Sequence, residues 1–217
     1  MVIDLSKDNS LLNHWVAELR DVAVQKDRMR FRRNIERIGE VAAYELSKTL
    51  RFKHVEVTTP LGIASTPLLE TQPVLATILR AGLPLHQGML NYFDKADNAF
   101  ISAYRKHHPD GSFDIRLEYL SCPDLNHRVL ILCDPMLATG ASLVETIQEI
   151  QKTYTPAQIH IVVTIASQKG IAHVEKELGA AIPIWCASID PTLNDKSYIV
   201  PGLGDAGDLA FGTKMQS

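Results

Sequence analysis

Residues 129–142 read Val-Leu-Ile-Leu-Cys-Asp-Pro-Met-Leu-Ala-Thr-Gly-Ala-Ser, and this stretch decides the fold. Its first five residues are apolar, which is typical of a β-strand that is buried on both faces. A single carboxylate, Asp134, follows the run and precedes a loop of small residues. Apolar residues then recur at helical spacing up to residue 152, and Ser142 and Glu145 have the spacing of a capping box, so we expect a helix from Ser142. The stretch therefore predicts a strand, a loop and a helix in that order.

This order gives the loop a chemical preference. The backbone N–H groups of residues 139–142 gather at the N-terminus of the expected helix. Unpaired N–H donors and the helix dipole both favour an anion at such a position. The stretch therefore predicts a phosphate site.

The rest of the chain supplies more strands of the same kind. Compact apolar runs occupy residues 74–79, 99–104, 159–166 and 182–189, and the helical stretch before the last run stops at Gly179. Strands that alternate with helices predict a parallel sheet flanked by helices, with ligands at the carboxyl ends of the strands. A chain of 217 residues suits one such α/β domain, spanning 1–217.

Four segments lie outside this alternation. Residues 11–50 predict an N-terminal arm of two helices with a break near Asp27, and residues 55–69 predict a β-hairpin. Residues 106–128 are the most irregular and are a candidate for a mobile flap. The tail carries four glycines and two carboxylates within eleven residues from Gly202. This composition predicts a loop without regular helix or strand, which either approaches a flat ligand or only closes the domain.

Composition and charge exclude several classes of protein. The formal charge of −3 and the pI near 6.2 argue against a general polyanion binder, so nucleic acid is not the expected partner. The basic cluster from Lys26 to Arg33 is interpreted as a solvated helix face or a subunit contact, with an anion or RNA surface as the alternative. No apolar run is long enough to span a bilayer and the N-terminus has no signal-peptide pattern, so we expect a cytoplasmic protein. The three cysteines lack metal-ligand spacing.

Polar residues follow the apolar runs where ligands are expected. Arg80, Arg105, Asp134 and Asp190 each stand directly after such a run. A carboxylate can accept hydrogen bonds from two vicinal hydroxyls, and two arginines can bind a pyrophosphate leaving group through charge-assisted bonds. Together with the phosphate site, these residues suit a ligand that bears a 5′-phosphate, a ribose diol and a pyrophosphate.

Five segments carry a resemblance to a known family: Ile78-Leu79-Arg80-Ala81-Gly82, Tyr104-Arg105, Asp134 to Ser142, Ala187-Ser188-Ile189-Asp190, and Tyr198 to Asp208. In order and spacing they resemble the uracil phosphoribosyltransferases, over nearly the whole chain. The resemblance implies a type I phosphoribosyltransferase-like, Rossmann-like α/β fold with an N-terminal helical arm, a β-hairpin and a C-terminal base-binding loop. It also implies transfer of ribose 5-phosphate from phosphoribosyl pyrophosphate (PRPP) to uracil, which gives UMP and pyrophosphate with Mg²⁺.

The same resemblance assigns residues to subsites. Pyrophosphate is assigned to Arg80 and Arg105, the ribose hydroxyls to Asp134, and the 5′-phosphate to residues 139–142. The full set implied for PRPP is Arg80, Arg105, Asp134, Pro135, Met136, Leu137, Ala138, Thr139, Gly140, Ala141, Ser142 and Asp205. The set implied for uracil is Ile199, Gly204, Asp205 and Ala206. Mg²⁺ is carried mainly by PRPP, with a contribution from Asp205, and no covalent catalytic residue is nominated.

Some questions stay open at this point. Ala141 stands where the family usually has a second glycine, and a methyl group there is compatible with the first turn of a helix. A transferase for another nucleobase is an alternative on the same fold, and an RNA-binding regulator that uses the Lys26 to Arg33 cluster is a second alternative. We also expect a homo-oligomer, a dimer or a tetramer.

Overall fold

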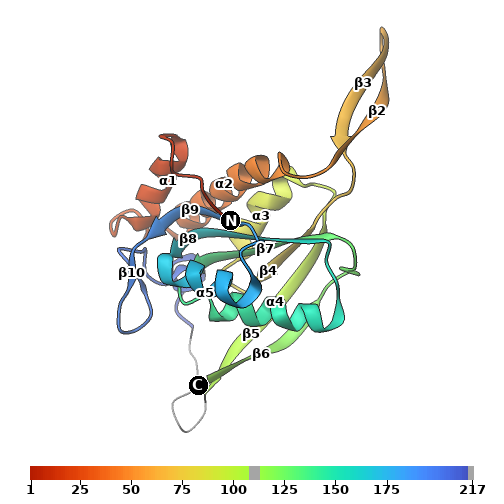
Figure 1. The fold of residues 1–217 in the computed structure, drawn as a ribbon. Coiled ribbons are helices and arrows are strands. Elements are labelled where there is room, and N and C mark those ends of the chain that lie inside the picture. The colour runs from red at the N-terminus through yellow and green to blue at the C-terminus, as the bar shows by residue number, and fades with distance from the viewer. Residues whose placement is uncertain (108–112, 215–217) are drawn as a thin grey trace.

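The computed structural model describes residues 1–107 and 113–214, except for the side chains of residues 103–107 and 113–118. A seven-stranded sheet in the order β1-β9-β8-β7-β4-β5-β6 forms its centre, and every neighbouring pair is parallel except β5 with β6 (Figure 1). This confirms the predicted parallel sheet, with two edge strands added that were not predicted, the parallel β1 and the antiparallel β6. The strands of the sheet are β1 (Val2–Asp4), β4 (Val74–Ile78), β5 (Asp97–His107), β6 (Phe113–Ser121), β7 (Val129–Leu137), β8 (Gln158–Ser167) and β9 (Ile184–Asp190).

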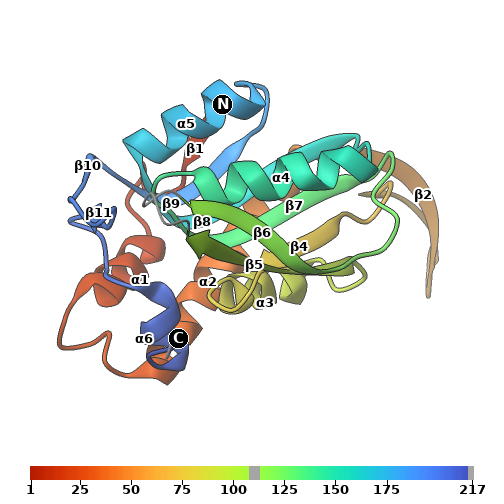
Figure 2. The same ribbon diagram turned by 90° about the horizontal axis from the view of Figure 1, so that it is seen from below.

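Helices cover both faces of the sheet (Figure 2). Alternate residues of β7 show the division: Ile131 and Cys133 belong to one buried cluster and Leu130 and Leu132 to the other. Because successive side chains of a strand point to opposite faces, an unbroken apolar run such as that of residues 129–133 serves both layers. The first face carries α1 (Leu11–Arg20), α2 (Arg28–Ser47) and α3 (Leu83–Tyr92), and the second carries α4 (Ala141–Thr153) and α5 (Gln168–Leu178).

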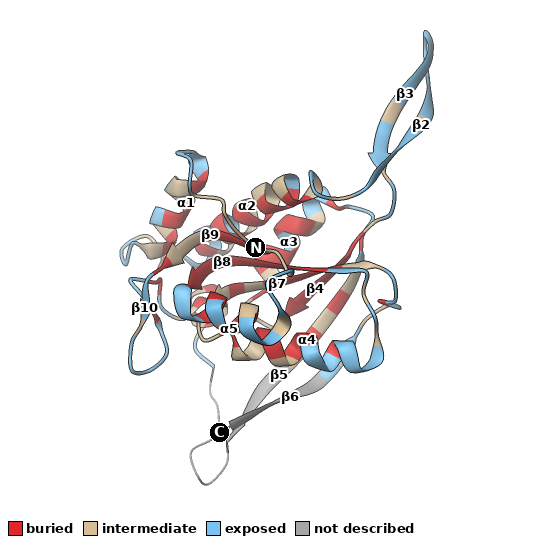
Figure 3. Cartoon of the chain, viewed as in Figure 1, coloured by how far each residue is buried: buried red, intermediate tan, exposed pale blue. Residues whose placement is uncertain are grey.

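The N-terminal arm follows the prediction. Ser10 caps α1 and Asp27 caps α2, where the Asp27 side chain accepts a hydrogen bond from the Arg30 amide at 3.0 Å. The break near Asp27 is therefore a helix start fixed by a capping side chain. The predicted hairpin is also present, as β2 (Phe52–Thr59) paired antiparallel with β3 (Gly62–Leu69). It projects from the body of the domain and is mostly exposed (Figure 3).

Two expectations for irregular segments were wrong. Residues 106–107 belong to β5, and residues 113–121 form β6, whose backbone groups pair with those of β5. Residues 122–128 keep the irregular character that was expected. Residues 108–112 of the proposed flap lie outside the described part of the chain. The C-terminal tail holds β11 (Ile199–Val200), which pairs with β10 (Thr192–Leu193), and the short helix α6 (Ala206–Phe211). Within the described ranges, no helix is long and apolar enough to cross a membrane.

Candidate active site

Asp134 lies inside β7, three residues before the end of the strand. The sequence pattern predicted that the strand ends at Cys133, and this was wrong because β7 continues beside β8 through Leu137. Pro135 lies within this part of the strand and has no backbone N–H to donate to the neighbouring strand. Asp134 is half-buried among apolar strands. Loss of hydration raises the pKa of its carboxyl to about 7, although a hydrogen bond from the Met136 amide acts in the opposite direction. The site therefore holds a carboxyl that is easily protonated until a ligand offers it hydrogen-bond donors.

The loop after β7 turns into α4 at Gly140. Gly140 is the N-cap with a φ of +84°, and no side chain caps the helix, so the predicted capping box of Ser142 and Glu145 is wrong. The left-handed conformation of Gly140 starts the helix one residue earlier and places Ser142 within its first turn. Ala141 is the first helical residue, which agrees with the expectation that a methyl group is tolerated there.

The first N–H groups of α4 are not part of its helical hydrogen-bond ladder. The amide of Val144 donates to the carbonyl of Gly140 at 3.0 Å, and the amides before it precede that ladder. The Ala141 amide donates to the hydroxyl of Thr139 at 3.4 Å. Residues 139–142 thus stand at a helix N-terminus, and their binding of a phosphate stays a prediction.

The β8–α5 connection supports this loop from behind. The Ser167 hydroxyl donates to the Ala138 carbonyl at 2.6 Å and accepts from the Gly170 amide at 2.8 Å. A Cβ at Gly170 would lie 2.4 Å from the Ala138 carbonyl oxygen, and a Cβ at Gly140 would lie 2.9 Å from the Gly170 carbonyl oxygen. Backbone packs directly on backbone here, so the position of the phosphate loop depends on α5. Sequence reasoning missed Ser167, and the Ser-x-x-Gly pattern at a helix start was the available signal.

Arg80 lies in the turn between β4 and α3. Gly82 ends that turn so close to β7 that a Cβ on it would lie 2.8 Å from the Cys133 carbonyl oxygen. The Arg80 guanidinium donates from Nη2 to the Gly212 carbonyl at 2.8 Å and to Asp208 Oδ1 at 3.3 Å. The peptide bond between Leu79 and Arg80 is cis. The turn therefore touches the strand that carries Asp134 and reaches the C-terminal helix.

Arg105, the second arginine predicted for pyrophosphate, lies in β5 opposite Ile115 of β6. Strand β5 is the direct neighbour of β4. The side chain of Arg105 is outside the described part of the chain, so its role stays a prediction.

The glycine-rich tail was expected to lack regular structure, and α6 contradicts this. Three of the four glycines flank the helix, Gly202 and Gly204 before it and Gly212 after it, each with positive φ. Asp205 is the N-cap, and its Oδ1 accepts a hydrogen bond from the Asp208 amide at 2.9 Å. Glycines at the ends of a helix do not weaken its interior, so counting glycines led to the wrong prediction.

A partly buried ion pair fixes the tail to the sheet. Asp190 ends β9, accepts two hydrogen bonds from Arg20 at 2.6 and 2.8 Å, and also accepts from the Gly202 amide at 2.9 Å. Arg20 donates in turn to the Gly202 carbonyl at 3.0 Å. The N–H of Gly202 is therefore bonded to the end of β9, and its carbonyl is bonded to Arg20 at the end of α1. The sequence pointed to Asp190 as a strand-end residue but gave no sign of its partner.

The residues predicted for uracil occupy one short segment between this anchor and α6. Ile199 and Ala206 are buried, Asp205 is half-buried and Gly204 is exposed with a φ of +96°. A Cβ on Gly207 would lie 3.6 Å from the Cβ of Ala81, so the start of α6 packs on the Arg80 turn. The structure therefore brings the Arg80 turn together with β7, which carries Asp134, and with the tail.

Partners within the chain account for much of the basic cluster. Arg30 forms an ion pair with Glu18 at 2.5 Å, and Arg33 forms one with Glu36 at 2.7 Å. Arg32 donates to the Ala210 carbonyl at 2.6 Å, and its guanidinium lies 5.9 Å from the centre of the Phe211 ring. Arg30 thus joins α2 to α1, Arg32 joins α2 to α6, and Arg33 pairs within α2, which favours a structural interpretation over an RNA surface.

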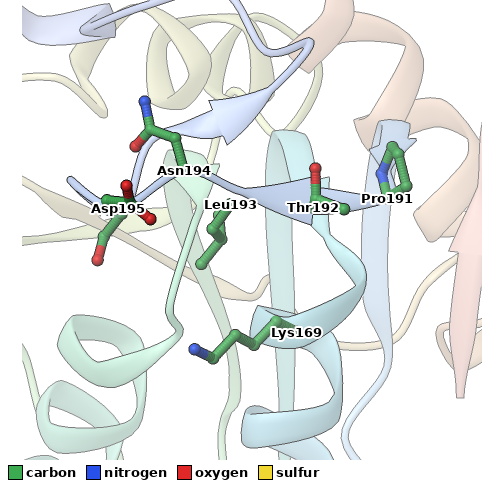
Figure 4. Close-up of a pocket in the computed structure, with 7 residues that line it drawn as sticks. Lys169, Pro191, Thr192, Leu193, Asn194 and Asp195 are labelled. Atoms are coloured by element: carbon green, nitrogen blue, oxygen red, sulfur yellow. The ribbon is translucent and has the colours of Figure 1, made fainter.

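A pocket of about 520 Å³ opens beyond the carboxyl end of β9 (Figure 4). Lys169, at the start of α5, points into it from one side, and the segment that includes β10 forms the other side. None of the residues predicted for PRPP or uracil lines it. The lining residues are Lys169, Pro191, Thr192, Leu193, Asn194, Asp195 and Ser197.

Comparison with known proteins agrees with this geometry. The chain is 53% identical over 214 residues to a uracil phosphoribosyltransferase of Porphyromonas gingivalis, covering 99% of both chains, and 36% identical to that of Methanothermobacter thermautotrophicus, covering 94% of this chain and 93% of the relative. A solved protein of Aquifex aeolicus superposes with a TM-score of 0.87 at 29% identity over the full length of both chains. The adenine phosphoribosyltransferase of Trypanosoma brucei, with a TM-score of 0.60 at 11% identity over 90% of this chain and 86% of its own, shares the fold.

A family model described as uracil phosphoribosyltransferase matches residues 6–213, which contain the phosphate loop, the Arg80 turn and the tail. On that match and on the identity to the two relatives, the chain belongs to the uracil phosphoribosyltransferase family.

Proposed function

We propose that the protein transfers ribose 5-phosphate from PRPP to uracil and releases UMP and pyrophosphate. One observation carries the proposal beyond the names of its relatives: the Arg80 turn touches both the strand of Asp134 and the C-terminal tail. A reaction that joins a base to a ribose phosphate needs the two substrates side by side, and this turn adjoins both predicted subsites.

Each part of the site then has a role in binding PRPP. The amides at the start of α4 bind the 5′-phosphate, and Asp134 accepts hydrogen bonds from the ribose hydroxyls, which favour the ionised form of its carboxyl. Arg80, together with Arg105, binds the pyrophosphate as negative charge develops on it. The C1′–oxygen bond to pyrophosphate breaks with its electron pair on the leaving pyrophosphate, the bond from C1′ to N1 of uracil forms, and N1 gives up its proton to the released pyrophosphate or to water. Catalysis rests on positioning and charge stabilisation, with no covalent side chain.

The tail supplies the selectivity for uracil. Backbone groups from Ile199 to Ala206 match the two acceptors and the N3 donor of uracil. Cytosine carries an amino donor at position 4, so a backbone N–H directed at that position would be left unpaired, which costs about 1–3 kcal/mol. Other bases are disfavoured for the same reason if their hydrogen-bond donors and acceptors along this edge differ from those of uracil.

Mg²⁺ fits the site as a companion of PRPP. Across the described residues no group of three or more His, Cys, Asp or Glu side chains could hold a metal ion. Mg²⁺ commonly binds through substrate phosphates, water and one or two carboxylates, and Asp205 at the start of α6 can provide one. When bound, the ion neutralises charge on the pyrophosphate. The cytoplasmic location, the homo-oligomer and the single domain stay predictions.

The test is a product assay on the purified protein with PRPP, Mg²⁺ and a choice of bases. We expect UMP from uracil, with little product from cytosine, xanthine or orotate in competition. Arg80→Ala should lose most of the turnover, whereas Arg128→Ala should keep it, because Arg128 pairs with Asp97 at the amino end of β5. Absence of UMP at saturating substrates would refute the proposal, and a preferred product from another base would replace uracil in it.

A further inference from the structure

Asp208 of α6 meets the predicted pyrophosphate arginine at the edge of the site. Arg80 is 39% exposed and Asp208 is 31% exposed, and their side chains approach to 3.3 Å. Both bonds of the Arg80 guanidinium to the tail, to Asp208 and to the Gly212 carbonyl, leave from Nη2. Among the described residues, Nε and Nη1 of Arg80 have no acceptor in the chain. Nη2 of the guanidinium is thus fixed, and Nε and Nη1 remain as donors.

From this geometry we propose that Asp208 is a positioning residue for the pyrophosphate subsite, acting through Arg80; the inference rests on the proposed function. The Nε and Nη1 N–H groups of a guanidinium can each donate a charge-assisted hydrogen bond to an anion, and they do so more readily when the orientation of the planar group is set beforehand. Asp208 and the Gly212 carbonyl set that orientation by binding Nη2. The charge of the carboxylate also favours keeping the cation at this place.

The short helix that carries Asp208 is itself fixed at several points. Arg32 binds the carbonyl of Ala210 near the C-terminal end of α6, and the Asp205 side chain caps the N-terminal end. The amide of Lys214 lies 3.4 Å from Oδ1 of Asp208. The carboxylate therefore stands on a supported element and can hold the arginine in a defined position.

This arrangement links the two halves of the site. The segment that contains the predicted uracil residues continues directly into α6, and α6 holds the arginine predicted to bind the leaving group. The tail would then contribute to PRPP binding as well as to base selection.

Asp208→Asn is the first variant to measure, because it keeps the shape and the acceptor oxygen but removes the charge. We expect KM for PRPP and the inhibition constant of pyrophosphate each to rise by about fivefold, which is the largest effect expected from the loss of a partly exposed ion pair. KM for uracil should stay unchanged. Asp208→Glu restores the carboxylate and should recover part of the loss. Asp97→Asn is the matched control, since it removes the carboxylate of another partly exposed arginine pair, with Arg128 at 3.0 Å, outside the site.

A double-mutant cycle decides whether Asp208 acts through Arg80. In an Arg80→Lys background, Asp208→Asn should have little further effect on pyrophosphate inhibition. An equal effect in both backgrounds, a parallel rise in KM for uracil, or a fall in KM for PRPP would each overturn the inference. Calorimetry measures pyrophosphate binding directly and without turnover. Failure to form UMP would therefore count against the proposed function, while the calorimetric comparison of the variants would still test the role of Asp208.

Discussion

Ser167 offers a quantitative test of how the phosphate loop is supported. Its side chain is fully buried, and its hydroxyl bonds both the Ala138 carbonyl and the Gly170 amide. Ser167→Ala would leave these two backbone groups without their partner. A buried polar group without a partner costs about 1–3 kcal/mol, so we expect the free energy of unfolding to fall by about 2–4 kcal/mol after partial relaxation.

The same strand provides the control. Thr164 is also fully buried in β8, but its hydroxyl has no hydrogen-bond partner among the residues that the structure describes. Thr164→Val removes a hydroxyl of the same kind while keeping the shape of the side chain. Because no bond is lost, the free energy of unfolding should stay the same or rise.

Urea unfolding at constant m-value measures both variants, and thermal melting checks them. For a chain of this size, each kcal/mol lowers Tm by roughly 2–4 °C, so Ser167→Ala should melt on the order of 10 °C lower. KM for PRPP should rise more than KM for uracil, because the bond supports the phosphate loop. If Ser167→Ala and Thr164→Val proved equally stable, the two short hydrogen bonds would not contribute to the support of this loop.

Two further predictions concern carboxylates of the site. Asp205→Asn should keep the melting temperature, because asparagine caps a helix about as well as aspartate, whereas Asp205→Ala should lose about 1 kcal/mol. If Asp205 serves PRPP and its metal, Asp205→Asn should still lower turnover, and unchanged turnover would make it a cap alone. Burial raises the folded-state pKa of Asp134 from 3.8 to about 7, so the native state binds a proton that the unfolded state releases, and stability should fall as pH rises from about 4 to 7. Urea unfolding across this range should show a flatter profile for Asp134→Asn than for the parent protein, and an unchanged slope would assign the pH dependence to other groups.

The strands of the sheet were predictable because local patterns determine them. Apolar runs of five or more residues mark strands covered on both faces, and the two helical layers account for that burial. Residues that follow such runs collect at one edge of a parallel sheet, so Arg80 and Asp134 could be grouped before the fold was known. Strand β6 was missed because its pairing with β5 satisfies a segment whose own sequence has no clear apolar run.

Helix starts were harder to predict where backbone conformation replaced side-chain capping. Ser142 and Glu145 have the right spacing for a capping box, but the positive φ of Gly140 starts α4 earlier. In the tail, the same count of glycines fits a loop or a short helix with glycines at its ends. The position of the capping Asp205 between them was the signal that favoured the helix.

The contacts that complete the site join residues far apart in the chain. Arg20 and Asp190 are separated by 170 positions, and Arg80 and Asp208 by 128. No local pattern relates such pairs, so Arg20 looked like an ordinary charged residue of a helix, and Arg80 was predicted to bind pyrophosphate without any sign of Asp208 as its partner. Only the fold shows that both bind the C-terminal segment.

These pairs explain why a substrate subsite can be built from a short terminal segment. A segment with positive φ at Gly202 and Gly204 would gain little from packing alone, since glycine loses more conformational freedom on folding than other residues. The Arg20–Asp190 pair fixes the entry of this segment through both sides of Gly202, and Arg80 and Arg32 fix its exit at α6. Charged hydrogen bonds at the two ends therefore offset the entropy of the residues between them. The backbone groups proposed for uracil lie in that interval, so their positions depend on arginines that come from three other parts of the chain.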